Sequence, residues 1–239
     1  MLLGANFDKI STNFLGFEIL EPNALISDTI MAIVSIVLAY KMRELRTLSN
    51  FSKLWFWFFL IYGLSSFMGG LSHAFFNYWG ISGKIFTWIT AIVSVLLIEL
   101  AMITLYFDLS KARLLKNIAL AKTILVALTV LFICLLFPVK DSPEIVFTPI
   151  AINTIIGLIL STGILGFRYT RFRNSHYKYF YKGVFIMLPS TFFFLGQINI
   201  HPWFDKNDVS HYLMTVGIIF FYFGVIKTIH DHSLVQEIN

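Results

Sequence analysis

The chain has 239 residues, of which 57% are hydrophobic, 17% aromatic and only 13% charged. A soluble domain carries about a quarter charged residues, so this composition excludes an ordinary soluble protein and favours one embedded in lipid. The net charge of +5 does not indicate nucleic-acid binding, because the basic residues gather in the connections between long apolar runs.

The first 23 residues precede the apolar runs. Asp8 and Lys9 lie near the start, and the segment has no basic first part, apolar core or small-residue cleavage site. We therefore do not expect a cleavable signal peptide. Because the stretch Phe7–Leu20 is mildly amphipathic, we expect residues 1–23 to form an extracytoplasmic or interfacial segment on the outer membrane surface.

Seven apolar runs follow, each close to the roughly 20 residues that a helix needs to cross the bilayer core. They lie at 24–42, 52–77, 84–108, 118–138, 145–167, 178–199 and 208–230. The alternating segments of about ten residues that mark a membrane barrel are absent. The sequence predicts an all-α integral membrane protein, with one seven-transmembrane helix bundle at 24–230 and a cytoplasmic tail at 231–239.

Basic residues alternate between the two sides of this arrangement. Fourteen of the 18 lysines and arginines flank the first, third and fifth connections or the C-terminal end. Basic loops resist translocation, so this pattern predicts an outer N-terminus and a cytoplasmic C-terminus. The lack of a targeting signal favours the bacterial inner (plasma) membrane. The fourteen are Lys41, Arg43, Arg46, Lys53, Lys111, Arg113, Lys116, Lys122, Arg168, Arg171, Arg173, Lys178, Lys182 and Lys227.

Four ionisable side chains map to the outer ends of three predicted spans. Asp28 lies near the start of the first span, His73 near the end of the second, and Asp208 and His211 at the start of the seventh. An ionisable group inside a membrane is costly, so each is a candidate functional residue. The sequence therefore predicts a polar cavity in the outer leaflet.

Two imidazoles and a carboxylate are a suitable ligand set for a catalytic zinc ion with one open position. We expect His73 and His211 to supply the imidazoles and Asp28 to complete the set, with Asp208 as base or as the residue that orients a ligand. Such a metal would activate water for hydrolysis of an amide or ester. A membrane lipid is the expected substrate; no nucleic-acid partner is expected.

The same residues carry a resemblance to a known family. Seven spans, the element Glu21-Pro22-Asn23 before the first span, His73 ending the second and His211 opening the seventh resemble the CREST superfamily, which includes the alkaline ceramidases and the progestin and adipoQ receptors. The resemblance implies a zinc-dependent lipid amidase with three histidine ligands, a serine and an aspartate. Where that family has its serine, its aspartate and another histidine, this chain has Gly69, Lys84 and Asn207.

A second resemblance is to a bacterial family of uncharacterised seven-span proteins. It rests on the motifs GG-x-x-H, at 69–73, and ND-x-x-H, at 207–211. This resemblance implies the layout of the chain and no activity.

Two other classes of function stay open at this stage. Glu99 lies past the middle of the third predicted span, where a carboxyl can belong to a proton path. The protein could then be a proton- or ion-coupled transporter. A non-enzymatic seven-helix receptor or scaffold is the third class.

Overall fold

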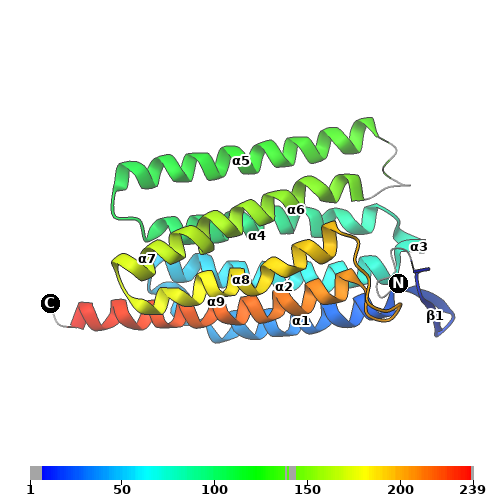
Figure 1. Ribbon diagram of the computed structural model, residues 1–239, viewed down its shortest axis with the longest axis horizontal. Coiled ribbons are helices and arrows are strands. Elements are labelled where there is room, and N and C mark those ends of the chain that lie inside the picture. Colours follow the sequence, from blue (N-terminus) through cyan, green and yellow to red (C-terminus); the bar gives the residue numbers. More distant parts are fainter. Residues whose placement is uncertain (1–6, 138, 140–143, 238–239) are drawn as a thin grey trace.

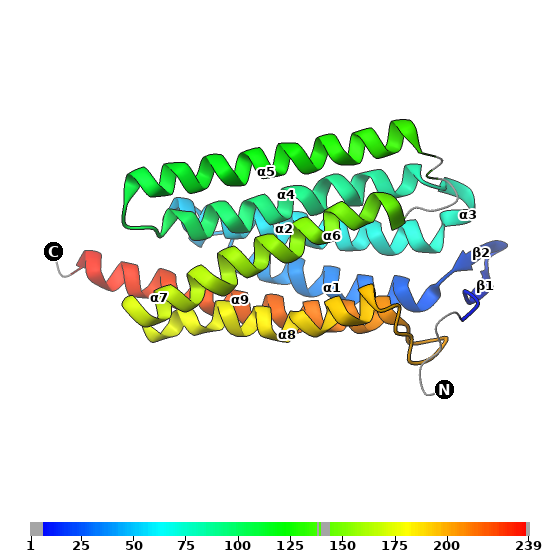
Figure 2. The same ribbon diagram turned by 45° about the horizontal axis from the view of Figure 1, so that its top comes forward.

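The computed structural model describes residues 7–137, 139 and 144–237, and the protein it describes is 81% helical. Long helices lie side by side along one axis in a single bundle (Figures 1 and 2). They are α1 (Pro22–Lys41), α2 (Asn50–Ala74), α4 (Ser82–Thr104), α5 (Leu109–Leu136), α6 (Glu144–Leu158), α8 (Lys178–Leu195) and α9 (Lys206–Glu237). Shorter elements are η1 (Leu45–Thr47), α3 (Phe76–Trp79), η2 (Ile159–Leu165), α7 (Gly166–Phe172) and η3 (Ser175–Tyr177).

Six helices in the described part of the chain are long and apolar enough to cross a membrane. The prediction of an all-α membrane protein is thus confirmed at this level. The sixth predicted span, at 178–199, corresponds to α8, but this helix ends at Leu195 rather than at residue 199 and is not one of the six. Lys178 and Lys182 at its start, and Pro189 within it, make it less apolar than its neighbours.

Several helix boundaries differ from the sequence prediction. Helix α5 begins at Leu109 rather than at residue 118, because the Asp108 side chain accepts hydrogen bonds from the backbone of Ser110 and Lys111 and caps the helix there. The fifth helix passes from α6 through a π-helical segment, η2, into α7. Helix α9 continues to Glu237, through most of the tail predicted at 231–239.

The amphipathic stretch before α1 is a β-hairpin. Strand β1 (Ser11–Phe14) pairs antiparallel with β2 (Phe17–Leu20), and Leu15 and Gly16 form the turn with positive φ angles. Glu21 follows at φ 47°, a left-handed conformation, and Pro22 then begins α1. The hairpin therefore delivers Glu21 to the bundle end at which α1 and α9 begin.

Large aromatic side chains fill the opposite end of the bundle. Trp55 and Phe180 stack with ring centroids 5.5 Å apart, and Phe221 lies 5.7 Å from Trp55; all three are fully buried. The three connections that carry most of the basic residues also lie at this end (Figure 1). The larger apolar cluster is thus centred there, whereas a smaller one of Trp88, Ile92, Val146 and Ile150 packs α4 against α6 toward the other end.

Candidate functional site

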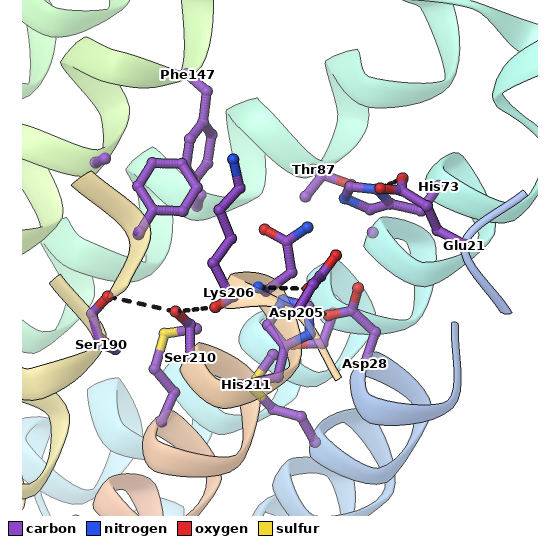
Figure 3. Close-up of a pocket in the computed structure, with 18 of the residues that line it drawn as sticks. Glu21, Asp28, His73, Thr87, Phe147, Ser190, Asp205, Lys206, Ser210 and His211 are labelled. Atoms are coloured by element: carbon purple, nitrogen blue, oxygen red, sulfur yellow. Dashed lines mark hydrogen bonds and ion pairs between the residues drawn. The ribbon is translucent and has the colours of Figure 1, made fainter. Parts of the chain in front are cut away.

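A cavity of about 710 Å³ lies at the bundle end where α1 and α9 begin and α2 ends. Its walls differ in chemistry. Helices α1, α2 and α9 contribute Asp28, His73 and His211, whereas α6 and α8 contribute apolar side chains such as Ile155 and Met187. Figure 3 shows the acidic and imidazole side chains grouped on one side, away from Phe147. The cavity is therefore amphipathic, with one polar and one apolar wall.

Behind the polar wall, the Asp208 carboxylate joins the first and last helices. Its Oδ2 accepts hydrogen bonds from Asn23 Nδ2 at 2.7 Å and from the Asp205 backbone N at 3.0 Å, and its Oδ1 accepts from Ser27 Oγ at 2.8 Å. Only 2% of Asp208 is exposed. Burial and the nearby Asp208 charge raise the pKa of Asp205, which precedes α9. Asp208 therefore holds α1 against α9 and does not itself line the cavity.

The imidazole of His211 lies between this carboxylate network and the cavity. Ser27 Oγ is 2.9 Å from His211 Nδ1, and Asp28 Oδ1 is 3.5 Å from His211 Nε2. A hydroxyl has one proton to donate. If Ser27 donates it to Asp208, it must accept from His211 Nδ1. That assignment leaves Nε2 unprotonated in the neutral ring, facing Asp28 Oδ1 at the cavity wall.

His73 forms a separate pair with Glu21. Its Nδ1 lies 2.7 Å from Glu21 Oε2, and Lys9 Nζ lies 3.3 Å from the same oxygen. Burial alone would raise the pKa of the Glu21 carboxyl, but the hydrogen bond and charge of His73, together with Lys9, outweigh it and hold the pKa at about 2. Glu21 is therefore an anchored carboxylate that fixes the orientation of the His73 ring.

Two glycines of α2 make room for Asp28. A Cβ atom at Gly70 would lie 2.9 Å from Asp28 Cβ and 3.3 Å from Leu25 Cα, whereas one at Gly69 would lie 3.5 Å from Asp28 Oδ2. Small residues let membrane helices approach closely. The Gly-Gly pair thus lets α1 pack on α2 with the carboxylate turned toward the cavity, where it is 4% exposed.

The structure brings three of the four predicted site residues to the cavity. Asp28, His73 and His211 line it, and Asp208 lies behind them. Gly69, Lys84 and Asn207, the positions at which the chain departs from the CREST pattern, also line the cavity.

The predicted zinc ligands are not arranged as a metal site. His73 directs Nδ1 at Glu21 rather than at Asp28 and His211. Among the described residues, no group of three or more His, Cys, Asp or Glu side chains is placed to hold a metal ion. Zinc binding by His73, His211 and Asp28 therefore stays a prediction, and the residues as arranged do not fit it.

Sequence reasoning missed Ser27 and the roles of Glu21 and Asn23. A signal was present, because Asn23 and Ser27 are four residues apart and so share one face at the start of α1. Their polar face points at α9, where Asp208 and His211 lie.

A second buried polar group lies away from the cavity. Lys122 Nζ of α5 is 3.1 Å from Glu99 Oε1 of α4 and also donates to Asn153 Oδ1 of α6. Glu99 and Asn153 are 5% and 2% exposed. Ala119 is the one residue of α5 that is buried, so this group is the main polar link between α5 and the bundle.

These features define an all-α membrane protein with an amphipathic internal cavity at one end of its helices. The chain belongs to DUF6962, a family of unknown function, whose match covers residues 24–230. No curated protein and no solved structure matches the chain. The resemblance to the CREST superfamily, to which nothing in these comparisons links the chain, stays a hypothesis.

The close approach of α1 and α2 generates a first prediction. We expect Gly70→Ala to destabilise the protein by about 1–3 kcal/mol, because the added Cβ overpacks against Asp28 and the backbone of Leu25. The matched control is Gly69→Ala, whose Cβ meets only ordinary contacts; it should be neutral or slightly stabilising. Thermal unfolding in detergent measures both. Equal melting temperatures for the two variants would contradict the packing described.

The anchored Glu21 carboxylate generates a second prediction. Its pKa is about 2 in the folded protein, against an ordinary 4.5. The stabilisation is therefore fully present above pH 4.5 and is lost as the pH falls through 2. At higher pH it amounts to about 3 kcal/mol at most, from the size of the shift. We expect the difference in melting temperature between wild type and Glu21→Gln to shrink from pH 6 to pH 2. A constant difference over that range would show that Glu21 is not held by charge.

Proposed function

We propose that this protein is a membrane-embedded hydrolase of a lipid amide or ester, with Asp28 and His211 as its acid–base pair. The observation that carries the proposal is the His211 imidazole, which is tied to Ser27 on one side and meets Asp28 on the other, at the polar wall of the cavity. Following the positive-inside rule, the site would lie in the outer leaflet, in a bacterial inner membrane.

The cavity suits a substrate with a polar head and an acyl chain. Phe147, Ile155 and Leu158 of α6 and Val184 and Met187 of α8 form its apolar wall. A chain laid along them would place the carbonyl group near Asp28 and His211. A ligand pocket is commonly apolar with a few convergent polar groups, and its volume of about 710 Å³ accommodates part of a lipid.

The polar groups can move the proton that hydrolysis requires. The Asp28–His211 pair, with Nε2 unprotonated, takes a proton from a water molecule whose oxygen bonds to the substrate carbonyl carbon. The tetrahedral adduct then breaks its bond to the amine or alcohol, which receives the same proton as it leaves. Ser27 and Asp208 keep the ring oriented throughout. General acid–base catalysis of this kind contributes about 10²–10⁴-fold to the rate.

Zinc is a separate element of the proposal, and no step above depends on it. Metal content can be measured directly on detergent-purified, tag-free protein. About one zinc per chain, lost in a His73→Ala, His211→Ala double variant, would establish the ligand set predicted from sequence. Active protein that is free of metal would assign the chemistry to Asp28 and His211 alone.

The proposal predicts release of fatty acid from N-acyl or O-acyl lipids in mixed micelles, followed by mass spectrometry. We expect Asp28→Asn and His211→Gln each to lower the rate by at least about 100-fold, the scale of one acid–base contribution. The matched control is Glu99→Gln, which neutralises a buried carboxyl outside the cavity and should keep the activity. Folded wild type that cleaves no acyl lipid class, or an Asp28→Asn variant with unchanged rates, would refute the proposal.

Proton- or ion-coupled transport is a second candidate, and the buried Glu99–Lys122 pair favours it. Replacing a buried ion pair by apolar residues is often neutral or stabilising, so stability alone is a weak reason for its presence. Intramembrane charges also mark proton relays.

Transport predicts proton flux in vesicles that contain the purified protein and an internal pH-sensitive dye, driven by a potassium diffusion potential. Flux should exceed that of protein-free vesicles and fall to their level in Glu99→Gln. Flux that is absent from wild type, or that is the same in Glu99→Gln, would exclude this role for Glu99.

A further inference from the structure

A second pocket lies at the opposite end of the bundle, where α1 ends and α2 begins. Its volume is about 730 Å³, and η1 and the first turns of α2 form it. The lining residues are Arg46, Thr47, Ser49, Asn50, Lys53 and Trp57. None of them contributes to the cavity described above, so this pocket is a separate feature.

The pocket has two positive charges and no negative one. Within the described part of the chain, neither Arg46 nor Lys53 has a carboxylate within ion-pair distance, whereas the adjacent Arg43 pairs with Glu44 at 3.4 Å. Arg46 is held in place by its guanidinium, which lies 4.8 Å from the centroid of the Phe56 ring. The side chains of Thr47 and Asn50 add neutral hydrogen-bonding groups. The pocket thus has the composition of a site for an anionic oxygen ligand.

An apolar track leads from this pocket along α2. Lys53 and Trp57 are one helical turn apart on the exposed face of the helix, and Leu64 and Phe67 continue that face. Trp57, Leu64 and Phe67 are 41%, 44% and 42% exposed. Because α2 is one of the helices long and apolar enough to cross a membrane, this track would run into the hydrocarbon region, with Trp57 at the level that tryptophan prefers.

We infer that this pocket binds the phosphate-bearing headgroup of an anionic phospholipid, with an acyl chain along Trp57, Leu64 and Phe67. Arg46 and Lys53 contact the phosphate, and Asn50 donates to an ester oxygen. Thr47, whose hydroxyl donates to the Glu44 carbonyl, accepts from a glycerol hydroxyl. Charge complementarity and the continuous apolar track together favour a lipid over a free anion, because a free anion has no acyl chain to pack along the track. This site is independent of the proposed hydrolase activity.

The start of α5 provides a matched comparison. Arg113 and Lys116 have the same charge and lie at the same end of the bundle, and neither lines the pocket. If binding depended only on the positive charge of this end, their removal would weaken it as much as removal of Arg46 and Lys53. If the pocket is responsible, only the latter pair matters.

The test is native mass spectrometry of the full chain in detergent, titrated with phosphatidylglycerol or phosphatidylcholine. We expect wild type to bind phosphatidylglycerol about 25-fold more tightly than phosphatidylcholine, from the two basic residues together. The Arg46→Gln, Lys53→Gln variant keeps most of each aliphatic stem and should lose this preference, by the roughly fivefold that each basic residue contributes near an anionic lipid. Arg113→Gln, Lys116→Gln should retain it. Melting temperatures within a few degrees of wild type show that both variants fold.

Three results would overturn the inference. Wild type could bind the two lipids equally. The α5 variant could lose as much preference as the pocket variant, which would assign binding to surface charge. Millimolar inorganic phosphate could displace phosphatidylglycerol completely, which would show a free-anion site. As a further check on the apolar track, Trp57→Ala should weaken the binding of both lipids by a similar factor. Weaker binding of phosphatidylglycerol alone would argue against contact with the acyl chain.

Discussion

The carboxylate of Asp208 is the constraint on which the polar end of this protein depends. It is buried between the first and last long helices and accepts hydrogen bonds from Asn23, Ser27 and the backbone of Asp205. A buried carboxylate without such partners would cost several kcal/mol. The three donors fix the position of α1 relative to α9, and this position in turn sets the place of Asp28, the next residue after Ser27, and of His211, nearly one turn after Asp208.

The two ends of the bundle are stabilised by different kinds of contact. Trp55, Phe180 and Phe221 pack tightly at the end where the basic connections lie, and this core contributes apolar packing in place of polar contacts. The other end encloses a cavity. There hydrogen bonds and ion pairs join α1, α2 and α9, while a smaller apolar cluster packs α4 against α6. The distribution is physically consistent, because polar groups buried in a membrane protein are stable only where other protein groups satisfy them.

The sequence was sufficient to predict the helices and the region of the candidate site, because both depend on strong local signals. Long apolar runs have few alternatives to helices in lipid, and an ionisable group within such a run is conspicuous. Asp28, His73 and His211 therefore reach one cavity as expected. Their partners could not be predicted. Glu21 reaches His73 only because a hairpin and a left-handed residue precede α1, and Ser27 is an ordinary residue of a membrane helix until α9 is placed beside it.

Helix ends were predicted less well, since hydropathy changes gradually where a helix leaves the membrane. Asp108 caps the start of α5 through a local hydrogen bond, which an average of hydropathy over a window does not detect. The predicted zinc ligands show a related limit of sequence-based prediction. Sequence can place three ligand types at one depth, but the direction of each ring depends on contacts such as that between His73 and Glu21.

The π-helical segment η2, between Ile159 and Leu165, affects every residue that follows it in the same long helix. A π turn closes after one residue more than an α turn, and each residue of an α-helix advances the side chains by about 100°. The segment therefore acts as a phase shift. It brings Tyr169 round to donate its hydroxyl to the Met102 carbonyl at 3.0 Å. Removing a single residue from η2 would restore regular α-helix and rotate the α7 side chains away from α4.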